Sequence, residues 1–451
     1  MITKYGASYL MYDMGMGKTL TCILAMKKVG MPVLVMAPLN AALNTWPAEL
    51  KKWAPDLTYT VLHGRNKEVI ARRSHTYDVI ILNFEGLYWW YKMVQKKIFK
   101  LRKYFVVWDE SSMLKDFNTK RWSIIAEAMP IWSRYRVCLS GTPMPNSMID
   151  LWSQYYLLDE GRALTPSFYT YRSTFFNYTG PPTYRTTIKP NADEKIFDRI
   201  APITDRLDAD DYLDLPEVIH NDISLELPPK LRRIYDKMEE DFQLEFPEGC
   251  AIANSEAVLA SKLRQFLQGG MYYEAQGARC LAPTREVKTF HNIKAELLKS
   301  IVDTSGGKPV LAPIQFSFEY QIMCDTFKKF LPIIHGKTKA EVTAKHIAAW
   351  NAGAYPVMLC HPRSVAYSLN LQAGGHIIYW AALPWEMELY KQLIARLRRQ
   401  GQTSSQVIVH RPIFRDTKDE RVARVLADKN ANQEDLFNAV LKRRRKYYGR
   451  S

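Results

Sequence analysis

The chain is poor in the features that mark secreted, membrane-spanning and metal-binding proteins. None of its six cysteines forms a CxxC pair or stands at a metal-ligand spacing beside histidine, so we expect reduced, mostly buried thiols in a cytoplasmic protein. No uninterrupted apolar run reaches 18 residues, and the N-terminus lacks the charged-then-apolar layout of a signal peptide. These absences predict a soluble protein that is neither secreted nor attached to a membrane.

Internal repeats and low-complexity tracts are also absent. Acidic residues are fewer than basic ones. Lys and Arg number 62 against 46 Asp and Glu, which gives a net charge of +16. Such a surplus favours a polyanionic partner, because each phosphate that a cation neutralises releases condensed counterions. Six of the cations lie in a tail at residues 442–450. This tail is either a solvated end or a binding element.

Short apolar runs that alternate with longer helical stretches are what the sequence does contain. This alternation predicts an α/β fold with parallel sheets covered by helices, and 451 residues suffice for two or three domains. In such sheets the chemistry lies at the carboxyl ends of the strands. The expected strands are 33–37, 79–82, 104–108, 137–139, 310–316, 357–360, 376–380 and 407–410.

The stretch between the two groups of strands has a different pattern. From residue 151 to 285, amphipathic helices are interrupted by prolines, which predicts a helical insertion and linker partly packed on the first lobe. We expect its aromatic cluster at 168–178 to form a small core rather than a platform for bases. The predicted domains are therefore a first lobe at 1–150, the insertion at 151–285, a second lobe at 286–440 and the tail at 441–451.

A phosphate-binding loop lies close to the N-terminus, between a strand-like run and a helix-like run. Its glycines let successive N–H groups face a phosphate at the start of the following helix. The lysine adds a charge on the β and γ oxygens, and the threonine supplies a hydroxyl for Mg²⁺. The predicted ATP-binding residues are Gly15, Met16, Gly17, Lys18, Thr19 and Leu20, although Tyr12 stands where the strict pattern has glycine.

Two adjacent carboxylates, Asp109 and Glu110, end the apolar run at 104–108. Side chains alternate along a strand, so these two acids can cooperate only if the strand ends there and the backbone turns. We expect Asp109 to bind Mg²⁺, usually through water, and Glu110 to orient the water that attacks the γ-phosphate. The phosphate loop about 90 residues upstream supports this interpretation, because an Asp-Glu pair alone is a weak signal.

A basic segment at residues 392–402 supplies candidates for charge stabilisation. Gln392, Arg396 and Arg399 are four and three residues apart, so on a helix they would share one face. A solvated basic helix is the alternative. We favour a catalytic role because arginines that stabilise a transferring phosphoryl group usually come from across a cleft.

Taken together, these motifs resemble helicase superfamily 2, specifically its Swi/Snf-type DNA translocases in the compact form carried by phages. The likeness covers roughly residues 10 to 425, and its most specific element is the Gln-x₃-Arg-x₂-Arg-x-Gly-Gln run. It implies two RecA-like lobes with ATP and Mg²⁺ between them, and an ATPase that works on duplex or branched DNA. For a phage protein the compartment would be the host cytoplasm.

The resemblance also implies roles for residues outside the ATP site. Ser140, Gly141 and Thr142 resemble the motif that couples the γ-phosphate site to DNA. The segment 368–372 resembles a motif of the second lobe. Contacts with the DNA backbone, which carry no sequence specificity, are implied for Pro38, Leu39, Asn40, Asn83, Phe84 and Asn370.

Three features depart from the family's pattern. One is Ala366 and Ser368, which stand where the family often has glycines. Only eleven residues precede Tyr12, whereas the family usually carries a glutamine-bearing adenine-recognition segment 20 or more residues upstream. Adenine is then read loosely or by another part of the chain, or the natural start lies further upstream. The acidic box ends in Ser111-Ser112 where many relatives have Ala-His, which removes one possible relay to the coupling motif.

Four functions remain open from the sequence. The leading one is a DNA-stimulated translocase that remodels DNA or protein–DNA complexes. A strand-separating helicase is the second, less favoured because no wedge hairpin or accessory DNA-binding domain is evident; an RNA-directed motor is less favoured still. The fourth is a nucleic-acid-binding scaffold without catalysis, against which the full set of ATPase residues argues.

Overall fold

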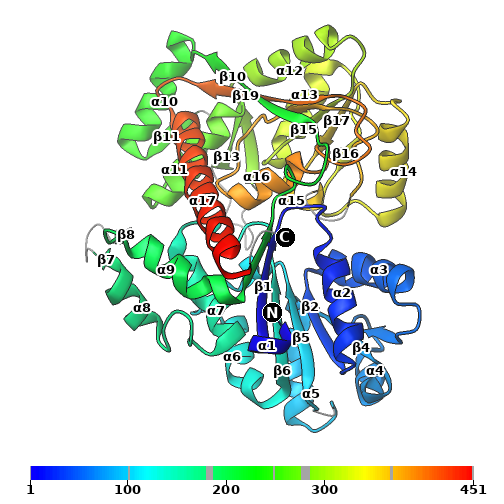
Figure 1. The fold of residues 1–451 in the computed structure, drawn as a ribbon. Helices are drawn as coiled ribbons and strands as arrows, with labels where there is room; N and C mark the ends of the chain where they lie inside the picture. The colour runs from blue at the N-terminus through cyan, green and yellow to red at the C-terminus, as the bar shows by residue number, and fades with distance from the viewer. Residues whose placement is uncertain are drawn as a thin grey trace. The chain divides into compact units, whose positions relative to one another are not determined.

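The computed structural model describes residues 2–99, 102–178, 186–246, 249–275, 285–365 and 369–448. It forms two compact units, one made of Met1–Leu213 with Lys429–Ser451 and the other of Asp214–Asp428. Each unit is built on its own parallel sheet (Figure 1). The predicted α/β class with two parallel sheets is therefore confirmed.

The first unit carries a seven-stranded parallel sheet in the order β3-β4-β2-β5-β6-β1-β9. Every residue of β1, β2, β4 and β5 is buried, as expected for a sheet covered on both faces. The strands are β1 (Ala7–Tyr12), β2 (Val33–Ala37), β3 (Tyr59–Val61), β4 (Val79–Asn83), β5 (Tyr104–Asp109), β6 (Ser133–Leu139) and β9 (Thr204–Leu207).

Helices cover both faces of this sheet (Figure 1). On one face α2 and α3 bury residues such as Ile23 and Trp46, and on the other α5, α6 and α7 bury Trp90, Ile125 and Tyr155. The helices are α1 (Ile2–Tyr5), α2 (Lys18–Val29), α3 (Trp46–Trp53), α4 (Lys67–Arg72), α5 (Leu87–Gln95), α6 (Lys120–Trp132), α7 (Leu151–Asp159), α8 (Phe168–Phe175) and α9 (Ala192–Ile200), with a hairpin of β7 (Phe176–Tyr178) and β8 (Thr186–Ile188).

The second unit has a six-stranded parallel sheet in the order β10-β19-β18-β15-β17-β16. Helices α12 and α13 pack on one hydrophobic cluster, and α14, α16 and the start of α17 pack on another. The elements are β10 (Glu217–Leu225), β15 (Val310–Pro313), β16 (Ile333–Ile334), β17 (Val357–Cys360), β18 (Ile377–Tyr379), β19 (Gln406–Phe414), α12 (Ile293–Thr304), α13 (Ser317–Phe327), α14 (Ala340–Asn351), α15 (Pro362–Val365) and α16 (Met387–Ile394).

The stretch between the predicted lobes differs from the expected helical insertion. Its strand β9 joins the first sheet, and its strand β10 joins the second. A four-stranded antiparallel sheet also lies there, with β11 (Gln243–Phe246), β12 (Gly249–Ile252), β13 (Gly270–Ala275) and β14 (Arg285–Thr289) beside α10 (Pro229–Asp241) and α11 (Glu256–Leu267). The sequence did not predict β10, because it is an edge strand whose residues are mostly exposed and which therefore has no continuous apolar run.

The aromatic cluster at 168–178 is confirmed as core packing. Tyr171, Phe175 and Phe176 are buried in the cluster that covers the first sheet. Only Tyr169 and Tyr178 in this segment are exposed among the large hydrophobic side chains. The segment therefore adds a helix and a strand to the hydrophobic core instead of presenting a row of rings to solvent.

The last helix, α17 (Lys418–Tyr448), begins in the second unit and ends in the first. The predicted boundary at residue 440 differs from this division, because Leu436 and Phe437 already pack in the core of the first unit. The predicted tail from 441 is helical as far as Tyr448, and Arg450 lies outside the described residues. Within the part of the chain that the structure covers, no helix is both long and apolar enough to cross a membrane.

The cysteines agree with the prediction of buried thiols. Cys22, Cys138, Cys324 and Cys360 are buried and unbridged, whereas Cys250 is partly exposed. Burial raises the pKa of the Cys22 thiol well above its usual value, so this thiol stays protonated. Cys280 lies outside the described residues.

Candidate ATP site and coupling segments

The phosphate loop connects the carboxyl end of β1 to the start of α2. Gly15 and Gly17 have φ angles of 83° and 74°, a left-handed conformation that glycine adopts without steric cost. Gly17 is the N-cap of α2, and no side chain caps the helix there. The first N–H groups of α2 are therefore available to an anion.

Lys18 lies at the centre of the candidate site. Its Nζ donates hydrogen bonds to the backbone carbonyls of Tyr12 (2.9 Å) and Asp13 (3.2 Å). Burial lowers the pKa of Lys18, while the charges of Glu110 and Asp109 oppose that shift. The structure thus brings the ammonium group of the loop and both predicted carboxylates within electrostatic reach of one another.

The strand ends and the backbone turns between the two acids, as expected for an acidic pair that acts together. The strand ends at Asp109, and Glu110 turns the chain with φ 51° and ψ 57°, a left-handed conformation that is uncommon for a residue with a side chain. Asp109 Oδ2 accepts a hydrogen bond from Trp46 Nε1 at 2.9 Å. Burial raises the pKa of Asp109, and the Trp46 hydrogen bond and Lys18 act in the opposite direction.

The predicted coupling segment Ser140–Thr142 lies against the phosphate loop. A Cβ atom added to Gly141 would be 3.4 Å from the carbonyl oxygen of Tyr12 and 3.8 Å from Lys18 Nζ. Ser140 Oγ accepts a hydrogen bond from the Thr142 backbone N–H at 3.0 Å. Thr142 Oγ1 is buried and has no hydrogen-bond partner among the described residues, so it suits a polar ligand.

The predicted DNA contacts of the first unit follow two neighbouring strands. Pro38, Leu39 and Asn40 follow β2, and β4, which ends at Asn83, pairs with β2 in parallel. Asn83 Nδ2 donates to Glu85 Oε2 at 2.8 Å. The ring of Phe84 is buried in the core, so only the backbone of Phe84 can reach a DNA strand.

The predicted helical face in the second unit is wrong. Helix α16 ends at Ile394, and residues Arg396 to Arg399 form successive turns, with Arg396 N–H bonded to Leu393 O and Leu397 N–H to Ile394 O, each at 3.0 Å. Where a continued helix would pair the Arg396 N–H with the Gln392 carbonyl, that carbonyl instead accepts a hydrogen bond from Arg396 Nε at 3.2 Å.

These turns bring together residues that we had expected in different roles. Arg399 Nη1 donates to Asn370 Oδ1 at 2.7 Å, although Asn370 was predicted to bind DNA. Gln392 is buried and donates through Nε2 to Glu388 Oε1 at 3.0 Å, and Arg396 Nε donates to the Gln392 carbonyl at 3.2 Å. Ser368, in the same predicted motif as Asn370, lies outside the described residues.

Sequence reasoning missed the support that β9 gives to the phosphate loop. Arg206 is buried and pairs with Asp13, with 2.9 Å between Nη2 and Oδ1, while the Ala209 N–H donates to the other oxygen of Asp13 at 3.0 Å. The Tyr12 hydroxyl donates to Asp205 Oδ2 at 2.6 Å. Burial alone would raise the pKa of Asp13, but Arg206 outweighs it and lowers that pKa. No motif spacing points to a partner almost 200 residues away.

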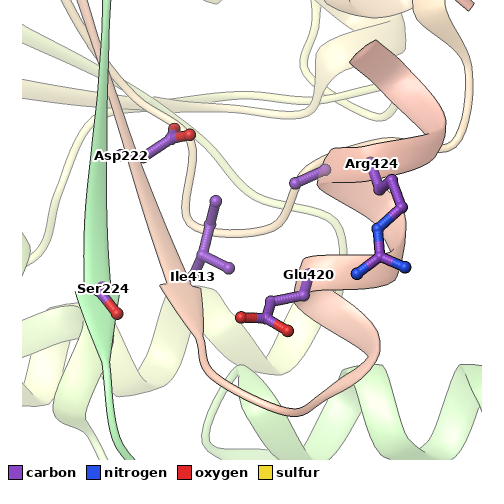
Figure 2. A pocket seen from close by; sticks show the side chains of 6 residues that line it. Asp222, Ser224, Ile413, Glu420 and Arg424 are labelled. Carbon is purple, nitrogen blue, oxygen red and sulfur yellow. The ribbon is translucent and has the colours of Figure 1, made fainter. Parts of the chain in front are cut away.

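A surface hollow in the second unit contains none of these residues. Figure 2 shows it between β10, the end of β19 and the start of α17. Asp222 on its wall is already held by Arg411, with 2.7 Å between Oδ2 and Nη2. The lining residues are Asp222, Ser224, Ile413, Glu420, Ala423 and Arg424.

Comparison with known proteins decides the family. The chain matches the SNF2-related domain over residues 6–271. It belongs to that family. The family resemblance inferred from the motifs is thereby confirmed.

Several relatives match this SNF2-family chain over most of its length. A protein of Acyrthosiphon pisum secondary endosymbiont phage 1 is 31% identical, over 95% of this chain and 93% of its own. A protein of Mycoplasma genitalium named as an uncharacterised ATP-dependent helicase is 26% identical, and one of Bacillus subtilis named as an ATP-dependent helicase/translocase is 22% identical. Those matches cover 94% and 97% of this chain but only 39% and 48% of the relatives.

Among solved structures, the Sulfolobus solfataricus SWI2/SNF2 ATPase core in complex with dsDNA is similar with a TM-score of 0.42 and 21% identity. The match covers 98% of this chain and 92% of that one. The SNF2-family chain thus spans nearly all of the phage relative and of this core, but less than half the length of the bacterial helicases.

Proposed function

We propose that the protein is an ATP-dependent DNA translocase, which hydrolyses ATP on duplex or branched DNA and remodels DNA or protein–DNA complexes. The observation that carries the proposal is the meeting of three motifs at the carboxyl ends of β5, β6 and β1, which are consecutive in the sheet. Gly141 after β6 lies close to Lys18 after β1, and Lys18 interacts with the carboxylates that end β5. A conformational switch that responds to the γ-phosphate requires the lysine, the acidic pair and the coupling segment to lie this close together.

In this proposal the first unit binds the triphosphate and starts hydrolysis. The backbone from Gly15 to Thr19 and the ammonium group of Lys18 hold the phosphates. Bound Mg²⁺ would neutralise charge on the phosphate oxygens, and Thr19 with Asp109 offers the oxygen ligands that this ion prefers. Glu110 orients the attacking water, and the Met16 and Leu20 backbones complete the loop.

The second unit contributes Gln392, Arg396 and Arg399 as polar and cationic groups that stabilise the transferring phosphoryl group. Asn370 bonds Arg399, so we assign it to positioning this arginine as well as to the DNA contact.

DNA is the proposed partner because the chain is strongly basic and the relatives are named as helicases or translocases. The backbone near Pro38, Leu39, Asn40, Asn83 and Phe84 would contact phosphates, without sequence specificity. The phage relative supports a site of action in the cytoplasm of a host cell.

The test is phosphate release by the wild type with no nucleic acid, duplex DNA, single-stranded DNA and RNA. We expect the strongest stimulation by duplex or branched DNA. Lys18→Ala and Glu110→Gln should each lower the turnover by about a hundredfold or more, the scale of losing one electrostatic or acid–base contribution. Lys27→Ala is the matched control, because Lys27 lies on the same helix but pairs with Asp56 at the surface.

Each result has a defined meaning. If neither variant lowers turnover, the assignment of the site is wrong, and equal stimulation by RNA and DNA would remove the DNA preference. Displacement of a triplex-forming strand without separation of the duplex would identify a translocase, whereas separation of the duplex would identify the helicase alternative.

A further inference from the structure

A buried network of polar side chains lies directly behind the acidic pair. It joins Tyr9 on β1, Ser111 next to Glu110, and Gln154 on α7, and all three residues are fully buried. The Tyr9 hydroxyl donates to Gln154 Oε1 at 2.6 Å. Ser111 Oγ lies 2.9 Å from the Tyr9 hydroxyl and 3.0 Å from the same amide oxygen.

The other end of the Gln154 amide reaches the coupling segment. Gln154 Nε2 donates to the carbonyl of Pro143 at 2.7 Å and to that of Asp150 at 2.9 Å. Pro143 directly follows Thr142, as Ser111 directly follows Glu110. The amide therefore connects the turn that carries Glu110 with the segment that lies against the phosphate loop.

The orientation of this amide is fixed by its partners. Hydroxyl groups face its oxygen and two carbonyl oxygens face its nitrogen, so both hydrogens and both acceptor positions are used. A rotated amide would leave buried donors and acceptors unpaired, which is strongly unfavourable in a dry interior. The Glu110 turn cannot shift relative to Pro143 without breaking hydrogen bonds of this network.

We propose that Gln154 is a positioning residue that links the Glu110 turn to the Ser140–Pro143 segment, so that a movement of one is transmitted to the other. The proposal rests on the proposed function, because it assigns Gln154 to the communication between ATP hydrolysis and DNA. Gln154 touches neither nucleotide nor DNA in this assignment. It determines how strongly DNA binding accelerates hydrolysis.

The neighbouring Tyr155 provides a control for packing. It is equally buried on the same helix, and its hydroxyl shares a hydrogen bond of 2.6 Å with Thr204 Oγ1. Thr204 begins β9 and belongs to neither of the two segments that Gln154 joins. Tyr155→Phe thus removes a buried hydrogen bond from α7 without touching the link.

The experiment measures phosphate release with and without duplex DNA for the wild type and three variants. In Gln154→Leu we expect the stimulation by DNA to fall about tenfold, the scale of coupling carried by such contact networks. The unstimulated rate and the affinity for ATP should stay within about twofold, because no ligand contact is lost. Ser111→Ala, which keeps the bond between Tyr9 and Gln154, should lose part of the stimulation.

Tyr155→Phe should keep the wild-type ratio of stimulated to unstimulated rates even where it lowers the melting temperature. The proposal is overturned if Gln154→Leu and Ser111→Ala keep the wild-type ratio, or if Tyr155→Phe loses as much of it as Gln154→Leu does. If Gln154→Leu does not fold, Ser111→Ala decides alone. A wild type that no DNA stimulates would instead refute the proposed function itself.

Discussion

At the scale of single residues, the environment of Asp109 is the most informative part of the candidate site. Its carboxylate is buried, yet the proposed role requires it to be ionised when it holds Mg²⁺. The Trp46 indole N–H and the Lys18 charge favour the ionised form against burial, which raises the pKa of Asp109. Trp46 should therefore influence the reaction without touching a ligand.

We predict that Trp46→Phe weakens the metal site. Without the indole donor the pKa of Asp109 rises further, so the acidic limb of the rate–pH profile should move to higher pH. A hydrogen bond to a charged group contributes about 1.5 to 3 kcal/mol, so the turnover at limiting Mg²⁺ should fall about tenfold or more. Titrating Mg²⁺ at several pH values measures both effects.

Trp53 on the same helix offers a matched control. Its indole N–H donates to Glu49 Oε2 at 2.9 Å, but both residues are at the surface. Trp53→Phe should leave the Mg²⁺ requirement and the acidic limb unchanged. An unshifted acidic limb in Trp46→Phe would show that Asp109 does not limit the reaction.

At the scale of helices and strands, the sequence was informative wherever burial was complete. The runs at 33–37 and 357–360 are strands with those bounds, because fully buried parallel strands need continuous apolar residues. The sequence was uninformative at the edges of the two sheets, where β9 and β10 have polar residues and depend on pairing with distant strands. The end of α16 was not predicted, because a side-chain nitrogen, Arg396 Nε, takes the Gln392 carbonyl that a continued helix would pair with the Arg396 N–H.

The candidate site shows the same contrast. The phosphate loop, the acidic pair and the coupling segment were all predicted, because each has a local pattern set by its chemistry. Arg206 and Gln154 were not, since their roles come only from the contacts that folding creates. From the sequence, Ser111-Ser112 in place of Ala-His removes one possible relay to the coupling motif. In the structure Ser111 Oγ hydrogen-bonds to the Tyr9 hydroxyl and to Gln154 Oε1, contacts that no sequence pattern indicates.

The strand β9 leads to a prediction about Arg206. The guanidinium of Arg206 lies between Asp13 and the ring of Phe437 on α17, and Arg206 Cζ is 3.9 Å from the centroid of that ring. Arg206→Met would leave the carboxylate of Asp13 without its cationic partner beside the phosphate loop. We expect the KM for ATP to rise about tenfold, equivalent to about 1.4 kcal/mol, and Phe437→Ala to produce a smaller rise.

Arg199 is the control for this prediction, since it also lies over a phenylalanine ring and bonds a backbone carbonyl but is on α9. Arg199→Met should lower stability without changing the KM for ATP. If Arg206→Met lowers the melting temperature and leaves the KM unchanged, the pair with Asp13 serves stability alone.

At the scale of the whole molecule, the net charge of +16 is the property that most affects binding to a polyanion. Part of that charge lies at Lys442, Arg443, Arg444, Arg445 and Lys446, where the backbone continues α17. Successive residues of a helix are about 100° apart, so five consecutive positions go all the way round the helix axis.

We predict that this basic segment adds affinity for DNA that depends on salt and not on sequence. Replacing its five cations with glutamine should flatten the plot of log K against log salt by about 0.9 for each phosphate that the segment engages. The same change should leave unstimulated ATP hydrolysis unaffected, because the phosphate loop and the acidic pair are untouched. Replacing the exposed Lys328 and Lys329 is the control. If the five glutamines leave the salt slope as steep as in the wild type, the segment is a solvated end, and the charge that attracts DNA lies elsewhere on the two units.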